Sequence, residues 1–479
     1  MDLRIPDEEI IQAMRYDNPW WVGEASQYDV LQPRVYLDRF FDLVGETAPI
    51  RAVVLLGPRR VGKTVLIHHC LRRLREERKV SGRKQVYLSI ESPTYTNQPL
   101  ERLFSMARQA TGETDPGGYT VCFDEIQYLT QWERHLKSLV ERYPTTKFVV
   151  SGSAAAALLR GATESGAGRF TEFLLPPLTF FEYLRMLGRE EIFRPDHLVY
   201  GGKEQFWWKA LDVSSLNTHF VDYINFGGYP EVALSPVIRR NAQRFLRSDV
   251  VDKVLLRDLP TLYGISNVTE LNSLFKVLAY QTGNELSYRN LTNQSELSRK
   301  TVERYLGYLE GAFLIRRVAK VDRRAARFKR QTTFKVYLTN SSLRAALFAP
   351  VAATDTTRLG NLVETAIFGQ WLQRDYVQPY YAAWQRGSTG GEVDLVALEE
   401  ATRRVRWAVE IKWSDKAIGA TGAKSPLLLF AAEHQLRNVL ITSRTARRSW
   451  TNSGINIVAV PSAEYAYNVG YRTLRPHRQ

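Results

Sequence analysis

The chain is poor in cysteine and has no apolar run long enough to span a membrane. Two cysteines among 479 residues, Cys70 and Cys122, are too few for a disulfide framework and suit a reducing compartment. No stretch approaches the roughly 18 apolar residues of a membrane span, and the charged segment from Met1 to Trp21 lacks the apolar core of a signal peptide. We therefore expect a cytoplasmic protein that does not engage a membrane.

Acidic residues are also scarce relative to basic ones. The chain has 50 Asp and Glu residues against 65 Lys and Arg residues, a formal net charge of +15. This excess favours a polyanionic partner, with nucleic acid first and an anionic membrane surface second. Hydrophobic residues make up 44% of the chain, which supports real cores, and the length allows roughly three domains of about 150 residues.

The stretch from Gly57 to Thr64 has the pattern G-x-x-x-x-G-K-T of a phosphate-binding loop. An apolar run precedes it and a helix-compatible run follows, whereas the alternative is a glycine turn before an ordinary helix. Inward-facing backbone N–H groups would cradle phosphates, Lys63 would reach the β- and γ-phosphates, and Thr64 would bind Mg²⁺. The predicted nucleotide-binding residues are Gly57, Pro58, Arg59, Arg60, Val61, Gly62, Lys63, Thr64 and Val65.

Polar residues end two later apolar runs. Asp124 would hold Mg²⁺ through water, and Glu125 would polarise the attacking water as general base. Ser151 and Ser153, at the tip of the run from residue 147, are both candidates to contact the γ-phosphate or orient water, and we predict Ser153 as catalytic. A solvated turn is the alternative in each case.

Arg169 precedes a predicted strand at residues 172–175. An arginine there can reach a neighbouring subunit's nucleotide and stabilise transition-state charge. Arg160 is the second choice, and a plain surface arginine is the alternative. Residues 181–258, with Phe206, Trp207 and Trp208 in the middle, are predicted to be helical and to form a lid; Arg244, Arg247 or Arg257 could sense the nucleotide there.

Residues 262–320 have the profile of a winged helix-turn-helix. The second helix is predicted from Arg299 to Glu310 with Ser298 as its N-cap, and Val302, Tyr305, Leu306 and Leu309 recur at helical spacing. Residues 316–335 then hold nine basic residues against one acid, Asp322, which suits phosphate contacts; a packing module or a solvated face is the alternative. The predicted DNA-binding residues are Arg299, Lys300, Arg304, Arg323, Arg324, Arg327, Lys329 and Arg330.

The last α/β segment carries an ordered set of acids and a lysine. Glu364 lies in a predicted helix, Asp394 in a predicted strand, and Glu410 and Lys412 share one face of the next strand. This order is similar to the PD-(D/E)xK nuclease core, with Val393 where the proline usually stands. Asp394 and Glu410 would bind Mg²⁺ with help from Glu364, and Lys412 would position or deprotonate water. The alternative is a fold kept as a DNA-binding or assembly platform.

Together these motifs resemble the AAA+ ATPases that carry a C-terminal DUF4143 domain. Besides the segments above, Gly227–Glu231 and Gly360–Glu364 match this family. The resemblance implies an α/β P-loop AAA+ core with a helical lid, a winged-helix middle segment, a restriction-endonuclease-like C-terminal α/β domain, and assembly into an oligomer, such as a hexameric ring. The predicted boundaries are 1–50 for a helical lead-in, 51–180 for the core, 181–258 for the lid, 259–330 for the winged helix, 331–466 for the nuclease-like domain and 467–479 for a mobile basic tail.

The function predicted from the sequence is Mg²⁺-dependent ATP hydrolysis by an oligomeric ATPase, coupled to binding and remodelling DNA or moving along it. Two alternatives remain open at this point. One is an ATP-gated, metal-dependent DNA endonuclease. The other is a slow nucleotide switch whose nuclease-like fold is catalytically silent.

Overall fold

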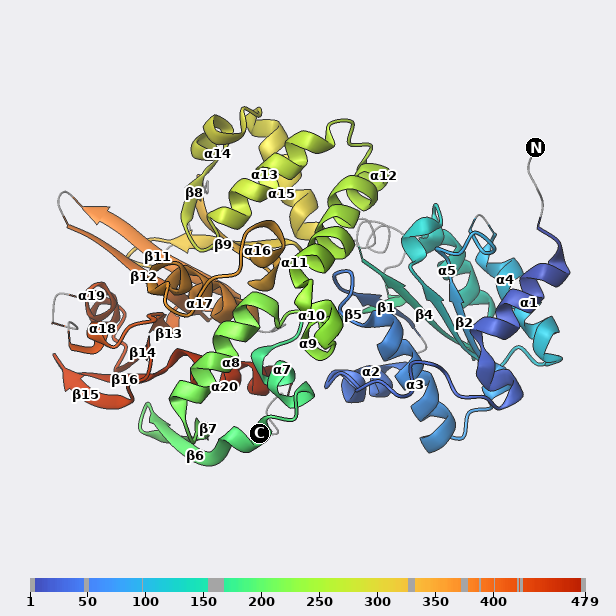
Figure 1. Cartoon of the computed structure of the whole chain (residues 1–479), viewed down its shortest axis with the longest axis horizontal. Coiled ribbons are helices and arrows are strands. Elements are labelled where there is room, and N and C mark those ends of the chain that lie inside the picture. Colours follow the sequence, from blue (N-terminus) through green and yellow to red (C-terminus); the bar gives the residue numbers. More distant parts are fainter. Residues whose placement is uncertain are drawn as a thin grey trace. The chain divides into compact units, whose positions relative to one another are not determined.

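The computed structural model describes residues 5–46, 51–96, 98–153, 168–325, 332–371, 378–386, 389–399, 401–419, 422 and 425–474. The chain divides into two compact units, Met1–Pro176 and Pro177–Gln479 (Figure 1). Within the described ranges, no helix combines the length and apolarity needed to cross a bilayer.

The first unit is built on a five-stranded parallel sheet in the order β2-β3-β4-β1-β5. Its strands are mostly buried apolar runs, as expected when helices cover both faces of a parallel sheet. The elements are α1 (Asp7–Asp17), η1 (Pro19–Val22), α2 (Leu37–Val44), β1 (Ala52–Leu56), α3 (Lys63–Glu77), η2 (Gly82–Lys84), β2 (Gln85–Ser89), α4 (Leu100–Thr111), β3 (Thr120–Asp124), η3 (Ile126–Tyr128), α5 (Trp132–Arg142), β4 (Lys147–Gly152) and β5 (Phe170–Leu174).

The N-terminal segment covers the edge strand β2. The Asn18 side chain accepts a hydrogen bond from the Tyr87 N–H at 2.6 Å and donates to the Tyr87 carbonyl at 2.9 Å. The indole N–H groups of Trp20 and Trp21 both donate to the Gln85 carbonyl. These contacts satisfy backbone groups that an edge strand would otherwise expose, so the two tryptophans are packing residues.

The second unit is built on a nine-stranded mixed sheet in the order β15-β16-β14-β13-β12-β11-β9-β10-β8. The pairs β13/β14, β14/β16 and β9/β11 are parallel, and the other neighbouring pairs are antiparallel. Its strands are β8 (Glu285–Ser287), β9 (Ile315–Val321), β10 (Thr333–Leu338), β11 (Pro379–Arg386), β12 (Thr389–Leu398), β13 (Val405–Glu410), β14 (Asn438–Ser443), β15 (Arg448–Asn452) and β16 (Ile455–Pro461).

Helices surround this sheet, and a separate two-stranded hairpin pairs β6 (Phe193–Tyr200) with β7 (Lys203–Ala210). The helices are α7 (Phe180–Met186), η4 (Glu190–Ile192), α8 (Val213–Phe226), α9 (Pro230–Leu234), α10 (Pro236–Arg240), α11 (Ala242–Phe245), η5 (Leu246–Asp252), η6 (Val254–Asp258), α12 (Leu259–Tyr263), α13 (Val268–Tyr280), α14 (Tyr288–Ser295), α15 (Arg299–Gly311), α16 (Ser342–Leu347), α17 (Thr356–Trp371), α18 (Lys416–Gly419), α19 (Pro426–Glu433) and α20 (Ser462–Leu474).

The helix predicted from Arg299 to Glu310 is confirmed as α15. Its N-cap is Ser298, whose hydroxyl accepts a hydrogen bond from the Thr301 N–H, and its buried residues are the four predicted ones, Val302, Tyr305, Leu306 and Leu309. The strands after it, β9 and β10, are antiparallel neighbours within the nine-stranded sheet. The boundary predicted between residues 330 and 331 falls in the segment that joins these two strands.

The prediction that residues 181–258 are helical throughout is wrong at residues 193–210. Phe206, Trp207 and Trp208 lie on β7, and Trp207 is buried with its indole N–H bonded to Glu464 of α20. The turn between the strands is Gly201-Gly202, with both residues at positive φ, which is a common two-residue hairpin turn. The alternation that this hairpin imposes sends successive aromatic residues to opposite faces.

Candidate nucleotide site and nuclease-like cluster

The loop from Gly57 to Thr64 joins β1 to α3 at the carboxyl edge of the parallel sheet. A Cβ atom at Gly57 would lie 2.2 Å from the carbonyl oxygen of Leu175, so the loop passes too close to the backbone for any side chain. Gly62 has φ +93°, which other residues rarely adopt, and it directly precedes the first residue of α3. The loop therefore turns sharply into a helix N-terminus, which is the geometry that a phosphate cradle requires.

Two arginines and a lysine brace this loop. Lys63 is 4% exposed, and its Nζ donates to the carbonyls of Gly57 and Pro58 at 3.1 Å each. Arg34 donates to the Val61 carbonyl at 2.5 Å. Arg59 donates to the hydroxyl of Tyr128 at 2.9 Å. The lysine ammonium is thus held inside the curve of the loop, where phosphate oxygens would lie.

The Asp124 carboxylate lies beside the loop because β3 ends at the same edge as β1. Its Oδ2 accepts hydrogen bonds from the hydroxyls of Thr64 at 2.6 Å and Tyr87 at 2.9 Å, and its Oδ1 accepts one from the hydroxyl of Ser151. The two predicted magnesium ligands, Thr64 and Asp124, are therefore in contact. Hydroxyl and carboxylate oxygens are the ligand type that Mg²⁺ prefers, so these residues fit the ion.

Glu125 follows Asp124 with φ +53°, an uncommon conformation for a non-glycine residue. Its carboxylate accepts a hydrogen bond from the amide of Gln127, which also donates to Ser153 at 3.3 Å. Burial raises the pKa of Glu125, opposed by the charge of Lys63 and reinforced by that of Asp124. Sequence reasoning gave a role to Glu125 and to Ser153 but none to Gln127 or to Tyr87.

Arg169 lies at the opposite edge of the sheet from the loop. Its carbonyl accepts a hydrogen bond from the N–H of Ala52, the first residue of β1, and its guanidinium pairs with Glu141 at 2.8 Å. A five-residue strand spans about 16 Å, so Arg169 does not reach the phosphate loop of its own chain. The second choice, Arg160, lies outside the described residues.

The acids predicted for the nuclease-like domain come from three elements, and Lys412 lies two residues beyond the last of these, so the prediction that Glu410 and Lys412 share one strand is wrong at Lys412. Glu364 lies on α17, Asp394 on β12, and Glu410 ends β13. Lys412 pairs with Glu410 at 2.7 Å and with Asp394 at 3.4 Å, and Asp394 also accepts a hydrogen bond from the Ile411 N–H at 2.8 Å. Glu364 does not contact Lys412; it bonds to another lysine.

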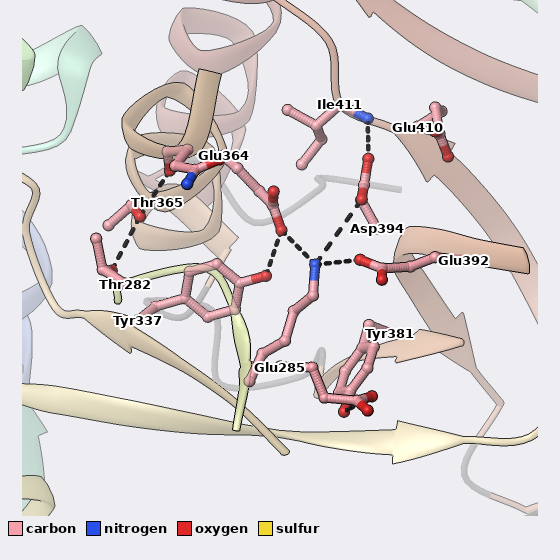
Figure 2. Close-up of polar contacts among 12 residues, drawn as sticks. Thr282, Glu285, Tyr337, Glu364, Thr365, Tyr381, Glu392, Asp394, Glu410 and Ile411 are labelled. Carbon is pink, nitrogen blue, oxygen red and sulfur yellow. Dashed lines mark hydrogen bonds and ion pairs between the residues drawn. The ribbon is translucent and has the colours of Figure 1, made fainter. Parts of the chain in front are cut away.

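That lysine is Lys335 of β10, which the sequence assigned to the basic run. Its ammonium lies 2.8 Å from Glu364, 2.6 Å from Glu392 and 3.9 Å from Asp394, and its side chain is 3% exposed (Figure 2). We call Lys335 with Glu364, Glu392 and Asp394 the Lys335 cluster. Lys335 is therefore not available to a phosphate backbone, which corrects the assignment of the whole run to nucleic-acid contacts.

Burial and mutual repulsion raise the pKa values of two acids in this region. Burial and the charge of Asp394 raise the pKa of Glu364 to about 7, although Lys335 opposes the shift. The same two causes raise the pKa of Glu410 to about 8, against the charge of Lys412. Burial alone would lower the pKa of Lys335, but the charges of the surrounding acids outweigh it and raise the pKa.

A divalent metal does not fit the nuclease-like residues as they lie. Among the residues that the structure describes, no three His, Cys, Asp or Glu side chains converge as ligands of one metal ion. A lysine ammonium stands between Glu364 and Asp394, and a second ammonium, that of Lys412, stands between Asp394 and Glu410. The arrangement instead pairs acids with lysines.

The predicted DNA-binding residues differ in how they are engaged. Arg299, Lys300 and Arg304 are exposed at the start of α15, and Arg299 also pairs with Glu303 along the helix. Arg323 pairs with Glu433, whereas the side chain of Arg324 is exposed. Arg327, Lys329 and Arg330 lie outside the described residues.

Comparison with known proteins defines the class of the N-terminal half. Residues 50–184 match the family model described as an AAA domain, and residues 217–355 match a domain of unknown function, DUF8612. The N-terminal half is therefore an AAA domain, a class that binds ATP, usually with Mg²⁺. The C-terminal match is to DUF8612 and not to DUF4143, the domain named in the resemblance above.

An uncharacterized protein of Haemophilus influenzae is 24% identical over 330 residues, which are 67% of this chain and 74% of that protein. Among solved structures, the Aeropyrum pernix ORC2 protein aligns with TM-score 0.37 and 16% identity over 71% of this chain and 92% of that one. The Aeropyrum pernix ORC1 protein in complex with DNA aligns with TM-score 0.30 and 16% identity over 68% of this chain and 95% of that one. With TM-scores this low, the class of residues 50–184 is assigned from the family model alone.

A buried histidine packs against Tyr87, one of the residues that hold Asp124 in place. His68 of α3 packs its ring against Tyr87, the residue that donates to Asp124, with ring centroids 4.4 Å apart, and its Nδ1 lies 2.9 Å from the hydroxyl of Ser26. Its Nε2 is buried and has no partner among the described residues. Burial lowers the pKa of His68 to about 4, partly offset by the charge of Asp124 and reinforced by Arg75.

This pKa predicts a loss of stability in mild acid. Unfolded imidazole binds its proton near pH 6.5 and folded His68 only near pH 4, so the free energy of unfolding should fall as pH drops between these values. From about pH 7.5 to about pH 5, we expect the wild type to lose about 2 kcal/mol more than His68→Gln, as measured by urea unfolding. The exposed His197→Gln variant should keep the wild-type pH dependence, and equal slopes for His68→Gln and wild type would contradict the assignment.

Proposed function

We propose that this protein hydrolyses ATP at the loop from Gly57 to Thr64. The observation that carries the proposal is the 2.6 Å contact between the Thr64 hydroxyl and the Asp124 carboxylate, next to a buried lysine ammonium. These two oxygens would hold Mg²⁺, which would neutralise charge on the phosphates. Lys63 would exchange its bonds to loop carbonyls for bonds to phosphate oxygens.

The roles of the remaining groups follow from their positions. Water attacks the γ-phosphorus, the bond to the bridging oxygen of ADP breaks, and Glu125 accepts the proton of the water. The raised pKa of Glu125 brings its proton affinity closer to that task. Gln127 links Glu125 to Ser153, so these two residues would orient the base, while Tyr87 and Ser151 fix Asp124.

We further propose that Arg169 completes the site of a neighbouring copy. It lies too far from its own loop to act there, and it is 38% exposed at an edge of the sheet, where another subunit can approach. A cation supplied in this way stabilises the charge that develops on the transferred phosphoryl group. The protein would then work as an oligomer.

The proposed partner is DNA, to which hydrolysis would be coupled. Support comes from the net charge of +15 and from the exposed Arg299, Lys300 and Arg304 in the first turns of α15, the helix predicted from the sequence to be a recognition helix. The exposed Arg324 follows the adjacent strand β9. Binding through these residues would be sensitive to salt because phosphate contacts release counterions.

Two substitutions separate binding of ATP from its hydrolysis. Lys63→Ala should abolish ATP binding, because the loop loses its only ammonium, and Glu125→Gln should keep binding but lower hydrolysis by about 100-fold or more. Equilibrium binding of a fluorescent ATP analogue and phosphate release measure the two effects. Lys79→Ala, an exposed lysine of the same unit, is the matched control. Unchanged hydrolysis in Glu125→Gln would refute the assignment of the base.

Complementation between subunits tests Arg169. Arg169→Ala alone should lower hydrolysis by about 10³-fold, because no subunit then supplies the arginine. Mixing it with the equally inactive Glu125→Gln should restore activity, since Glu125→Gln subunits lend Arg169 to sites that keep Glu125. Arg142→Ala, an exposed arginine at the end of α5, should stay active. An inactive mixture whose subunits assemble normally would rule out action between subunits.

A triple substitution tests the DNA surface. Changing Arg299, Lys300 and Arg304 together to Ala should weaken duplex binding and reduce the salt dependence of log K by about one per lost phosphate contact, measured by fluorescence anisotropy across salt concentrations. The control removes the same charge elsewhere, at Arg403, Arg404 and Arg406. Equal affinity and slope for both triple variants would show that α15 does not bind DNA.

A further inference from the structure

The Lys335 cluster is a cation site that already contains its cation. An ammonium has three N–H donors, and Lys335 faces three carboxylates, Glu364, Glu392 and Asp394. Figure 2 shows these three acids pointing toward one nitrogen between them. We propose that the Lys335 ammonium is the permanent counter-cation of this cluster, so that the nuclease-like domain binds no divalent metal there and does not cut phosphodiester bonds.

The position of Lys335 in the sheet makes its ammonium hard to displace. Lys335 lies on β10, between β9 and β8, paired with Val318 on one side and Glu285 on the other. Its side chain is 3% exposed, and its nitrogen lies 5.5 Å from the ring centre of Tyr381. Displacing the ammonium would leave the carboxylates of Glu364 and Asp394, whose side chains are 13% and 8% exposed, without this counter-charge, which is strongly unfavourable.

Other donors also bond two of these acids, and on Glu364 the same Oε1 accepts from both Lys335 and Tyr337. The Tyr337 hydroxyl donates to Glu364 at 2.6 Å, and the Asp394 oxygen that does not face Lys335 accepts from Ile411 N–H at 2.8 Å and Lys412 at 3.4 Å. Magnesium requires several oxygens at about 2.0–2.1 Å in octahedral geometry. In this structure the acids are instead paired with ammonium groups, and this favours a platform over an endonuclease.

The inference predicts that removing the ammonium creates a metal site. Lys335→Met keeps the length of the side chain and removes its charge, so the three acids should then attract a divalent cation. We expect Mn²⁺ to raise the melting temperature of Lys335→Met by about 3–6 °C more than that of the wild type, and to bind it with one additional site by calorimetry. The full-length protein without nucleotide is used for these two metal-binding measurements.

Two controls isolate the cluster from the nucleotide site. Lys335→Arg keeps a cation and should behave like the wild type, and Lys335→Met combined with Asp394→Asn should lose the added Mn²⁺ site. Incubating the wild type with plasmid and Mg²⁺, in parallel with and without ATP, should give no cleavage above that of Asp394→Asn. This result does not depend on ATP hydrolysis, so it stands or falls separately from the proposed ATPase.

Several outcomes would overturn the proposal. A wild-type Mn²⁺ site that disappears in Asp394→Asn would show that the ammonium yields to a metal, and so would wild-type cleavage that Asp394→Asn abolishes. A folded Lys335→Met variant that binds no additional Mn²⁺ would show that the lysine does not stand in for a metal. If Lys335→Met does not fold, the comparison of the wild type with Asp394→Asn decides the question by itself.

Discussion

The geometry of the first unit depends on how one carboxylate is held. Asp124 is 1% exposed and accepts hydrogen bonds from the hydroxyls of Thr64, Tyr87 and Ser151, which come from three different elements. Parallel pairing makes this convergence possible, because β1, β2, β3 and β4 all end at one edge of the sheet. A carboxylate fixed from three directions can hold a metal ion without reorganising, which is the arrangement that electrostatic catalysis requires.

Sequence reasoning succeeded where the chemistry is local in the chain. The phosphate loop, its flanking strand and helix, and the buried face of α15 follow from spacing within fewer than twenty residues, and the structure has all of them. It missed Tyr87 and Gln127 because their importance comes from pairing with Asp124 and Glu125 across strands or a turn. The hairpin at residues 193–210 carried a usable signal, the Gly201-Gly202 turn, which the density of aromatic residues obscured.

The nuclease-like cluster shows a different limit. Sequence reasoning could select a nuclease-like set of residues from their order along the chain, namely Glu364, Asp394, Glu410 and Lys412. It could not select Lys335, since a run of basic residues does not reveal which members point inward. Lys335 lies on β10, which pairs with β9 on one side and with β8 on the other. The acids around its side chain follow it in the chain by 29 to 59 residues. Only the sheet order joins the basic segment to the acids.

This pairing changes what the net charge means. The formal excess of +15 is a property of the whole chain, but several basic residues near β9 and β10 are neutralised within the second unit: Arg317 by Glu310, Lys320 by Glu285, Arg323 by Glu433, and Lys335 by its cluster. A side chain paired in this way must break its ion pair before it can bind phosphate. Among the described residues of this segment, the groups with most to gain from a phosphate are therefore the exposed Lys300, Arg304, Arg316 and Arg324, whereas Arg299 would first release Glu303. The proposed polyanion contacts would then fall on the first turns of α15 and at the two ends of β9, while Lys320 and Lys335 of the neighbouring strands are paired with acids.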